Sequence, residues 1–151
     1  MSRRAASESA MTISARCAAS VIAVRPKTGE IVWHYQWTPN DMYDYDGVNE
    51  IILGDVGGKK LWFHGSRNGH VYGIDRINTV AGKAGKEHKC VWVTALQRVN
   101  WTKPITPANN CKPIYNWPEK DVVYDHPTTD IAPSLDGGKE WHPMSFSRRT
   151  N

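Results

Sequence analysis

The chain has 151 residues, 40% hydrophobic and 23% charged, which suits one domain with a modest core and excludes the composition of a disordered protein. Its formal net charge is +4, but the positive residues gather near the N-terminus and in a loop-like stretch, with no basic helical face, so nucleic-acid binding has little support. No apolar run reaches the length of a membrane span, and the N-terminus lacks the continuous apolar segment of a signal peptide.

Taken in chain order, residues 1–19 are rich in Ser, Ala and Arg and are expected to form a disordered or poorly packed tail. Short β-branched or aromatic runs punctuated by Gly, Pro, Asn and Asp then predict strands. They cover residues 20–24, 31–36, 50–54, 60–65, 70–75 and 90–95.

Turns are expected at residues 25–29 and 55–58, and the pair Asn68-Gly69 favours a type I′ hairpin turn. Residues 79–89 are small and basic and predict an exposed loop. The proline-rich stretch from residue 100 to residue 143 predicts long irregular segments, with a short strand around residues 121–124. Short strands with a turn every eight to twelve residues indicate an all-β fold, and their repetition suggests a β-propeller.

Three cysteines are present, Cys17, Cys90 and Cys111, and none lies in a C-x-x-C pair, so a zinc site has no support. Cys90 and Cys111 could pair in an oxidising compartment, which would leave Cys17 over. Two buried free thiols are the alternative.

The stretch at residues 38–50 places four carboxylates within ten residues: Asp41, Asp44, Asp46 and Glu50. If the backbone is extended there, Asp44 and Asp46 point to the same side. Two carboxylates on one side repel each other unless a proton or cation lies between them, which suggests a hard metal ion. The alternative is a solvated acidic turn.

Three motifs follow one another along the chain, at residues 23–33, 38–50 and 66–76, and in this order they resemble those of the PQQ-dependent (quinoprotein) alcohol dehydrogenases. Residues 23–33, with Ala23, Thr28, Gly29 and Trp33, resemble the tryptophan-docking motif of that family. Residues 38–50 resemble its active-site segment, and residues 66–76 resemble the segment that carries the arginine beside the cofactor. Shorter stretches up to residue 144 also match, so the resemblance covers roughly residues 20–147.

The resemblance implies that residues 20–151 form a partial β-propeller, about two to three blades of an eight-bladed one, with residues 1–19 unmatched. It implies pyrroloquinoline quinone (PQQ) and a metal ion as cofactors. It also implies oxidation of primary alcohols of the methanol or ethanol type to aldehydes in the periplasm, with a cytochrome c as electron acceptor; an oligomer is compatible with this. A non-catalytic propeller-repeat scaffold is the alternative.

By the same resemblance, Asp44 aligns with the catalytic base and is a metal ligand, and Arg67 aligns with the arginine that binds the quinone. Asp46 aligns with an aspartate typical of lanthanide-dependent members, whereas calcium-type members usually have a small neutral residue there. The sequence therefore favours a lanthanide site, with calcium as the alternative.

The sequence also departs from the family pattern. Glu140 stands where many members have an asparagine that contacts the quinone, so that role is not transferred to it. After Arg76 a second docking motif is expected, but about ten extra residues precede residues 89–92. The family's other metal ligands lie upstream of the matched region. The chain thus resembles an internal fragment, and little or no alcohol oxidation is expected from it alone.

Overall fold

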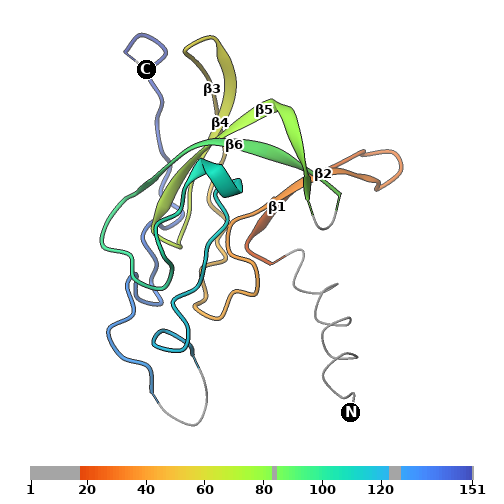
Figure 1. The fold of residues 1–151 in the computed structure, drawn as a ribbon. Helices are drawn as coiled ribbons and strands as arrows, with labels where there is room; N and C mark the ends of the chain where they lie inside the picture. The colour runs from red at the N-terminus through yellow and green to blue at the C-terminus, as the bar shows by residue number, and fades with distance from the viewer. Residues whose placement is uncertain (1–17, 83–84, 123–126, 151) are drawn as a thin grey trace, which may run out of the picture.

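The computed structural model describes residues 18–82, 85–122 and 127–150, and their regular structure is almost entirely β (Figure 1). The strands are β1 (Ser20–Val24), β2 (Ile31–Gln36), β3 (Ile52–Val56), β4 (Lys59–Gly65), β5 (His70–Gly82) and β6 (Gly85–Ala95). One 3-10 turn, η1 (Pro107–Asn109), follows within the described part of the chain. No helix in that part is long and apolar enough to cross a membrane.

The six strands form one curved sheet in the order β1-β2-β6-β5-β4-β3, as Figure 1 shows. Strands β3 to β6 make a four-stranded antiparallel meander, the unit of a propeller blade. The β1–β2 hairpin is antiparallel and joins this unit through a single parallel pairing of His34 with Glu87. The chain is therefore all-β and forms part of a β-propeller, as the sequence predicted.

Alternation of side chains along the strands gives the meander two faces. On one face, Trp62 and Tyr72 pack with Tyr35 and Trp37 of the β1–β2 hairpin in an aromatic core. Trp33, the tryptophan of the docking motif, lies against Trp62 and the His88 ring, with ring centroids 6.1 Å and 4.2 Å apart. The motif thus joins the hairpin to the neighbouring blade.

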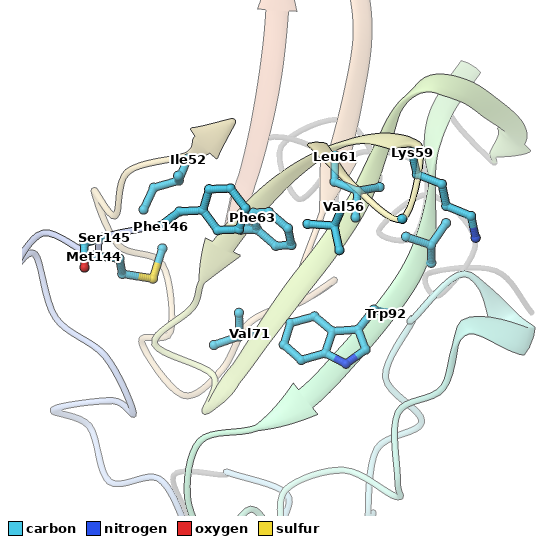
Figure 2. Close-up of a pocket in the computed structure, with 12 residues that line it drawn as sticks. Ile52, Val56, Lys59, Leu61, Phe63, Val71, Trp92, Met144, Ser145 and Phe146 are labelled. Carbon is cyan, nitrogen blue, oxygen red and sulfur yellow. The ribbon is translucent and has the colours of Figure 1, made fainter. Parts of the chain in front are cut away.

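The opposite face of the meander carries an apolar groove of about 660 Å³ (Figure 2). Leu61, Phe63 and Trp92 line it from the strands, and the chain's C-terminal segment contributes Met144 and Phe146. Figure 2 shows Phe146 lying over Phe63, and the two rings are stacked with their centroids 5.4 Å apart. The segment before the C-terminus is thereby held across the meander.

Two of the predicted strands, at residues 20–24 and 31–36, are confirmed with the same bounds. The loop predicted at residues 79–89 is wrong where the structure describes it, because residues 79–82 and 85–89 are strand. They extend β5 and β6 into a long hairpin that reaches β2. The ladder shifts between Asp75 and Thr79, where the Asp75 carboxylate accepts hydrogen bonds from the backbone of Ile77 and Asn78. This bulge redirects the hairpin, and β2 supplies a ladder partner that local sequence does not reveal.

The third strand begins two residues later than predicted, at Ile52. Asn68-Gly69 does lie in the turn between β4 and β5, but the type I′ turn was wrong, because Gly69 has a positive φ (91°) and Asn68 does not. Asn68 is fully buried, and its side-chain amide donates to the Thr38 and Tyr72 hydroxyls. The strand expected around residues 121–124 is absent at residues 121–122, and its remainder lies outside the described residues.

Cys90 of β6 and Cys111, just after η1, form a disulfide with a Cα–Cα distance of 5.9 Å. Both residues are fully buried, and the backbone N–H of Cys90 also donates to the Asn110 side chain. The sequence left open whether these two cysteines pair or remain buried free thiols, and in the structure they pair. The bond attaches the irregular segment after β6 to the blade.

Candidate active site

The acidic stretch at residues 38–50 is not extended, so the geometric premise of the sequence argument was wrong. Asn40 and Asp44 both have a positive φ, of 52° and 60°. Burial nevertheless alternates, because Tyr43 and Tyr45 are buried while Asp44 and Asp46 are exposed. The two tyrosines stack on each other and pack on Trp101, and this aromatic cluster presents the two aspartates to the surface.

Asp41 has a structural role in this stretch. Its carboxylate accepts hydrogen bonds from the backbone N–H groups of Tyr43, at 3.0 Å, and Tyr45, at 2.7 Å. Burial raises the pKa of Asp41, and these hydrogen bonds oppose the rise because they favour the charged form. The tyrosine hydroxyls then donate to distant carbonyls, those of Lys120 and Pro133, both at 2.6 Å. The loop that bears Asp44 is therefore fixed from both sides.

Glu50 is also structural. Its carboxylate pairs with the Lys139 ammonium at 3.1 Å and accepts a hydrogen bond from the backbone N–H of Met144. The backbone hydrogen bond and the lysine lower the pKa of Glu50. Of the four carboxylates in the acidic stretch, Asp41 and Glu50 thus stabilise the fold, which leaves Asp44 and Asp46 for chemistry.

Arg67, in the β4–β5 turn, is held in a narrow cradle between two glycines. A Cβ atom on Gly47 would lie 2.8 Å from the Arg67 Cδ, and one on Gly137 would lie 2.8 Å from its Cβ. The guanidinium donates through Nη2 to the Leu135 carbonyl, and the Gly138 N–H donates to the Arg67 carbonyl at 2.7 Å. The two glycines, 90 residues apart in sequence, fix where this cation lies.

The structure brings Asp44 and Arg67 together. The Asp44 Oδ2 lies 3.8 Å from the Arg67 Nη2. The side chain of Asp44 is 69% exposed, whereas that of Arg67 is only 18% exposed. Asp46 is exposed beside this pair in sequence, and no ion pair involving it is present among the described residues. The arrangement offers an accessible carboxylate next to a fixed positive charge.

Glu140 is a third charged group at this site, and sequence reasoning assigned it no role. Its Oε1 lies 3.6 Å from the Arg67 Nε, an otherwise unpartnered buried atom. It belongs to the Gly-Gly-Lys-Glu-Trp run at residues 137–141, in which Gly137 and Gly138 contact Arg67 directly, and no sequence signal alone indicates this proximity.

The side chains at this site provide some, but not all, of the contacts that PQQ and a metal ion would need. Arg67 can offer guanidinium N–H groups to an anionic or quinone oxygen. The exposed carboxylates of Asp44 and Asp46 are oxygen donors of the kind that hard cations take. Within the described residues, however, no three His, Cys, Asp or Glu side chains gather as a metal site. A cation there would need further ligands besides these two aspartates.

Comparison with known proteins agrees with the motif reading. Residues 11–84 match the family model described as "PQQ: Glucose/ethanol/alcohol dehydrogenase, beta-propeller domain". The chain is 38% identical over 135 residues to the lanthanide-dependent methanol dehydrogenase of Methylacidiphilum fumariolicum, covering 87% of this chain and 20% of that protein. It is 33% identical over 139 residues to a quinoprotein ethanol dehydrogenase of Pseudomonas putida, covering 85% of this chain and 21% of that protein.

Solved structures give the same result. A europium-containing methanol dehydrogenase matches with a TM-score of 0.72 and 37% identity, over 89% of this chain and 22% of that one. The quinohemoprotein alcohol dehydrogenase of Comamonas testosteroni matches with a TM-score of 0.69 and 30% identity, over 89% of this chain and 18% of that one. The chain spans about one fifth of the length of these curated relatives. In sequence motifs and fold, the chain thus resembles a segment of the PQQ-dependent quinoprotein alcohol dehydrogenases.

Proposed function

We propose that this chain carries part of the active site of a PQQ- and metal-dependent alcohol dehydrogenase, with Asp44 as the general base and Arg67 as a cofactor-binding residue. The single observation that supports this most is the 3.8 Å approach of the Asp44 carboxylate to the Arg67 guanidinium. Two motifs separated in sequence, each implied by the resemblance to be catalytic, meet there. A scaffold repeat, the alternative, has no need of this juxtaposition.

The chemistry of each residue follows from its environment. The exposed carboxylate of Asp44 is accessible to a small alcohol and can accept its hydroxyl proton. Arg67 stays charged and is fixed by the glycine cradle, so it can donate hydrogen bonds to an oxygen on which negative charge develops. Arg67 would hold PQQ, which would supply an acceptor for the hydride of the carbinol carbon, and Asp44 and Asp46 would hold a cation that would supply a Lewis acid.

Asp44 and Asp46 are proposed as metal ligands, with a lanthanide favoured over calcium. Attraction scales with the charge of the ion, so each additional carboxylate favours a trivalent ion more than a divalent one. The matched methanol dehydrogenases named as lanthanide-dependent and europium-containing support this choice. Residues 20–151 are proposed as the propeller part of the chain, and residues 1–19 as a tail.

A primary alcohol as substrate, a cytochrome c as electron acceptor and a periplasmic location are proposed with the family. The disulfide between Cys90 and Cys111 supports an oxidising compartment. The chain alone is expected to oxidise alcohols weakly or not at all, because two aspartates do not complete a metal site. Robust turnover of methanol or ethanol in a dye-linked assay with PQQ and either metal would contradict that expectation.

The test of the proposed metal site is titration of the purified chain with lanthanum and with calcium, followed by tryptophan fluorescence. We expect lanthanum to bind more tightly than calcium and Asp46→Ala to remove that preference. Asp55→Ala is the matched control, because Asp55 is an exposed aspartate on β3 that pairs with Arg76. Equal effects of the two variants, or tighter binding of calcium, would overturn the lanthanide assignment.

A further inference from the structure

Glu140 contacts the guanidinium that the proposed function assigns to the cofactor. Its carboxylate lies 3.6 Å from the Arg67 Nε, while Asp44 approaches the same guanidinium through Nη2. Arg67 is therefore flanked by two carboxylates on different edges. Both contacts are ion pairs, and the hydrogen bond of the guanidinium goes from Nη2 to the carbonyl of Leu135.

The position of Glu140 is fixed by the residues around it in the chain. Lys139, immediately before it, pairs with Glu50, and the Lys139 side chain fills the space that a Cβ atom on Gly65 would need. Met144, four residues after it, donates its N–H to Glu50. These anchors fix the backbone on both sides of Glu140, from which its side chain extends toward Arg67.

The consequence is electrostatic. A carboxylate beside a guanidinium reduces the positive potential that the guanidinium offers to another anion, and it repels that anion itself. It also favours guanidinium orientations that keep the Nε edge close to the opposite charge. Since the side chain of Glu140 is 38% exposed, solvent screens these effects and they are moderate in size.

We propose that Glu140 is a positioning residue, which lies against the Nε edge of Arg67, keeps Nη2 at the Leu135 carbonyl beside Asp44, and weakens the hold of Arg67 on an anionic ligand. The ligand is taken to be PQQ, and in this respect the inference rests on the proposed function. The holding of Arg67 itself does not depend on the ligand.

The first experiment observes Arg67 directly. In the ¹⁵N-labelled chain, the Nε–H signal of Arg67 is assigned by its loss in Arg67→Lys. We expect Glu140→Gln and Glu140→Ala to shift this signal and to speed its hydrogen exchange, whereas Glu119→Gln, a change at another exposed glutamate, leaves it unchanged. An unchanged Arg67 signal in both Glu140 variants would overturn the positioning role, whether or not PQQ binds.

The second experiment measures the dissociation constant of PQQ by quenching of tryptophan fluorescence. Glu140→Gln should bind PQQ about two- to fivefold more tightly than the parent chain, because it removes one exposed charge and keeps an acceptor for Nε. The gain should shrink as salt is added. Glu140→Ala should bind less tightly than Glu140→Gln, because only glutamine restores the partner of Nε.

The outcomes separate the two proposals. No binding of PQQ by the parent chain or by any variant counts against the proposed function, and the Nε–H signal then still decides the role of Glu140. Binding by the parent chain with an equal dissociation constant in Glu140→Gln leaves the proposed function standing. That result would contradict the inference about Glu140.

Discussion

The backbone N–H of Gly138 donates a hydrogen bond of 2.7 Å to the backbone carbonyl of Arg67. This contact attaches the segment that bears Glu140 directly to the turn that bears Arg67, the proposed cofactor-binding arginine. On the other side, Gly47 places the loop of Asp44 against the same side chain. Three parts of the chain therefore meet at Arg67.

Replacing Gly137 with alanine should both destabilise the chain and displace Arg67. Gly137 has a φ of 79°, where an alanine costs about 1–2 kcal/mol, and its new Cβ would lie 2.8 Å from the Arg67 Cβ. Gly57→Ala is the matched control, since its φ is 56° and no atom lies within 4 Å of the added Cβ. Urea unfolding should show a larger loss for Gly137→Ala, and PQQ affinity should fall only in that variant.

Asp41→Ala should lower the free energy of unfolding by about 1–3 kcal/mol, because two backbone N–H groups beside buried tyrosines lose their acceptor. Asp46→Ala, a few residues on and exposed, should change it by less than about 0.5 kcal/mol. Urea unfolding at neutral pH measures both. Equal effects of the two substitutions would mean that Asp41 does not fix the loop of Asp44.

His70 should make the chain sensitive to mild acid. Burial lowers the pKa of His70 from 6.5 to about 4, and its Nδ1 is buried without a hydrogen-bond partner. Between these two pH values the unfolded chain binds a proton that the folded chain does not, so stability is present above pH 6.5 and is lost as the pH falls toward 4. The full loss is ~3 kcal/mol for this one group.

In His70→Leu the slope of unfolding free energy against pH between 6.5 and 4 should therefore become shallower. Part of the slope should remain in this variant, because burial also lowers the pKa of His64 to about 4. His142→Leu, at an exposed position, serves as the control and should leave the slope as it is. A slope unaffected by His70→Leu would show that His70 is protonated in the folded chain.

The disulfide should be measurable by thiol counting. Of the three cysteines, Cys90 and Cys111 pair, so the denatured chain without reductant should expose one reactive thiol, and the reduced chain three. Replacing both paired cysteines with serine should cost about 2–4 kcal/mol of stability. Three reactive thiols before reduction would contradict the pairing.

Much of this fold could be predicted because its signals are local. The Thr28-Gly29 turn has its positive φ at Gly29, and the strands on either side of it pair as the predicted hairpin. The resemblance of two motifs to one family also implied that Asp44 and Arg67 share a site, and their side chains do approach each other. These features depend on neighbouring residues or on whole-motif similarity.

The remainder depends on contacts between distant residues, which a single sequence does not reveal. Glu50 belongs to the acidic stretch by composition, yet its partners are Lys139 and Met144, about 90 residues away. Residues 79–89 look like a loop because the strand that pairs with them, β2, lies far upstream. The role of Glu140 is visible only once Gly137 and Gly138 are seen to contact Arg67.

Whether Asp44 and Arg67 form one cofactor site is decided by equilibrium binding of PQQ in the presence of lanthanum. Isothermal titration of the chain and of Asp44→Asn, Arg67→Lys and the double variant gives a thermodynamic cycle. We expect the parent chain to bind PQQ, each single variant to bind it more weakly, and the losses to be non-additive in the double variant. No binding of PQQ by the parent chain, or strictly additive losses, would mean that the two residues do not form one site.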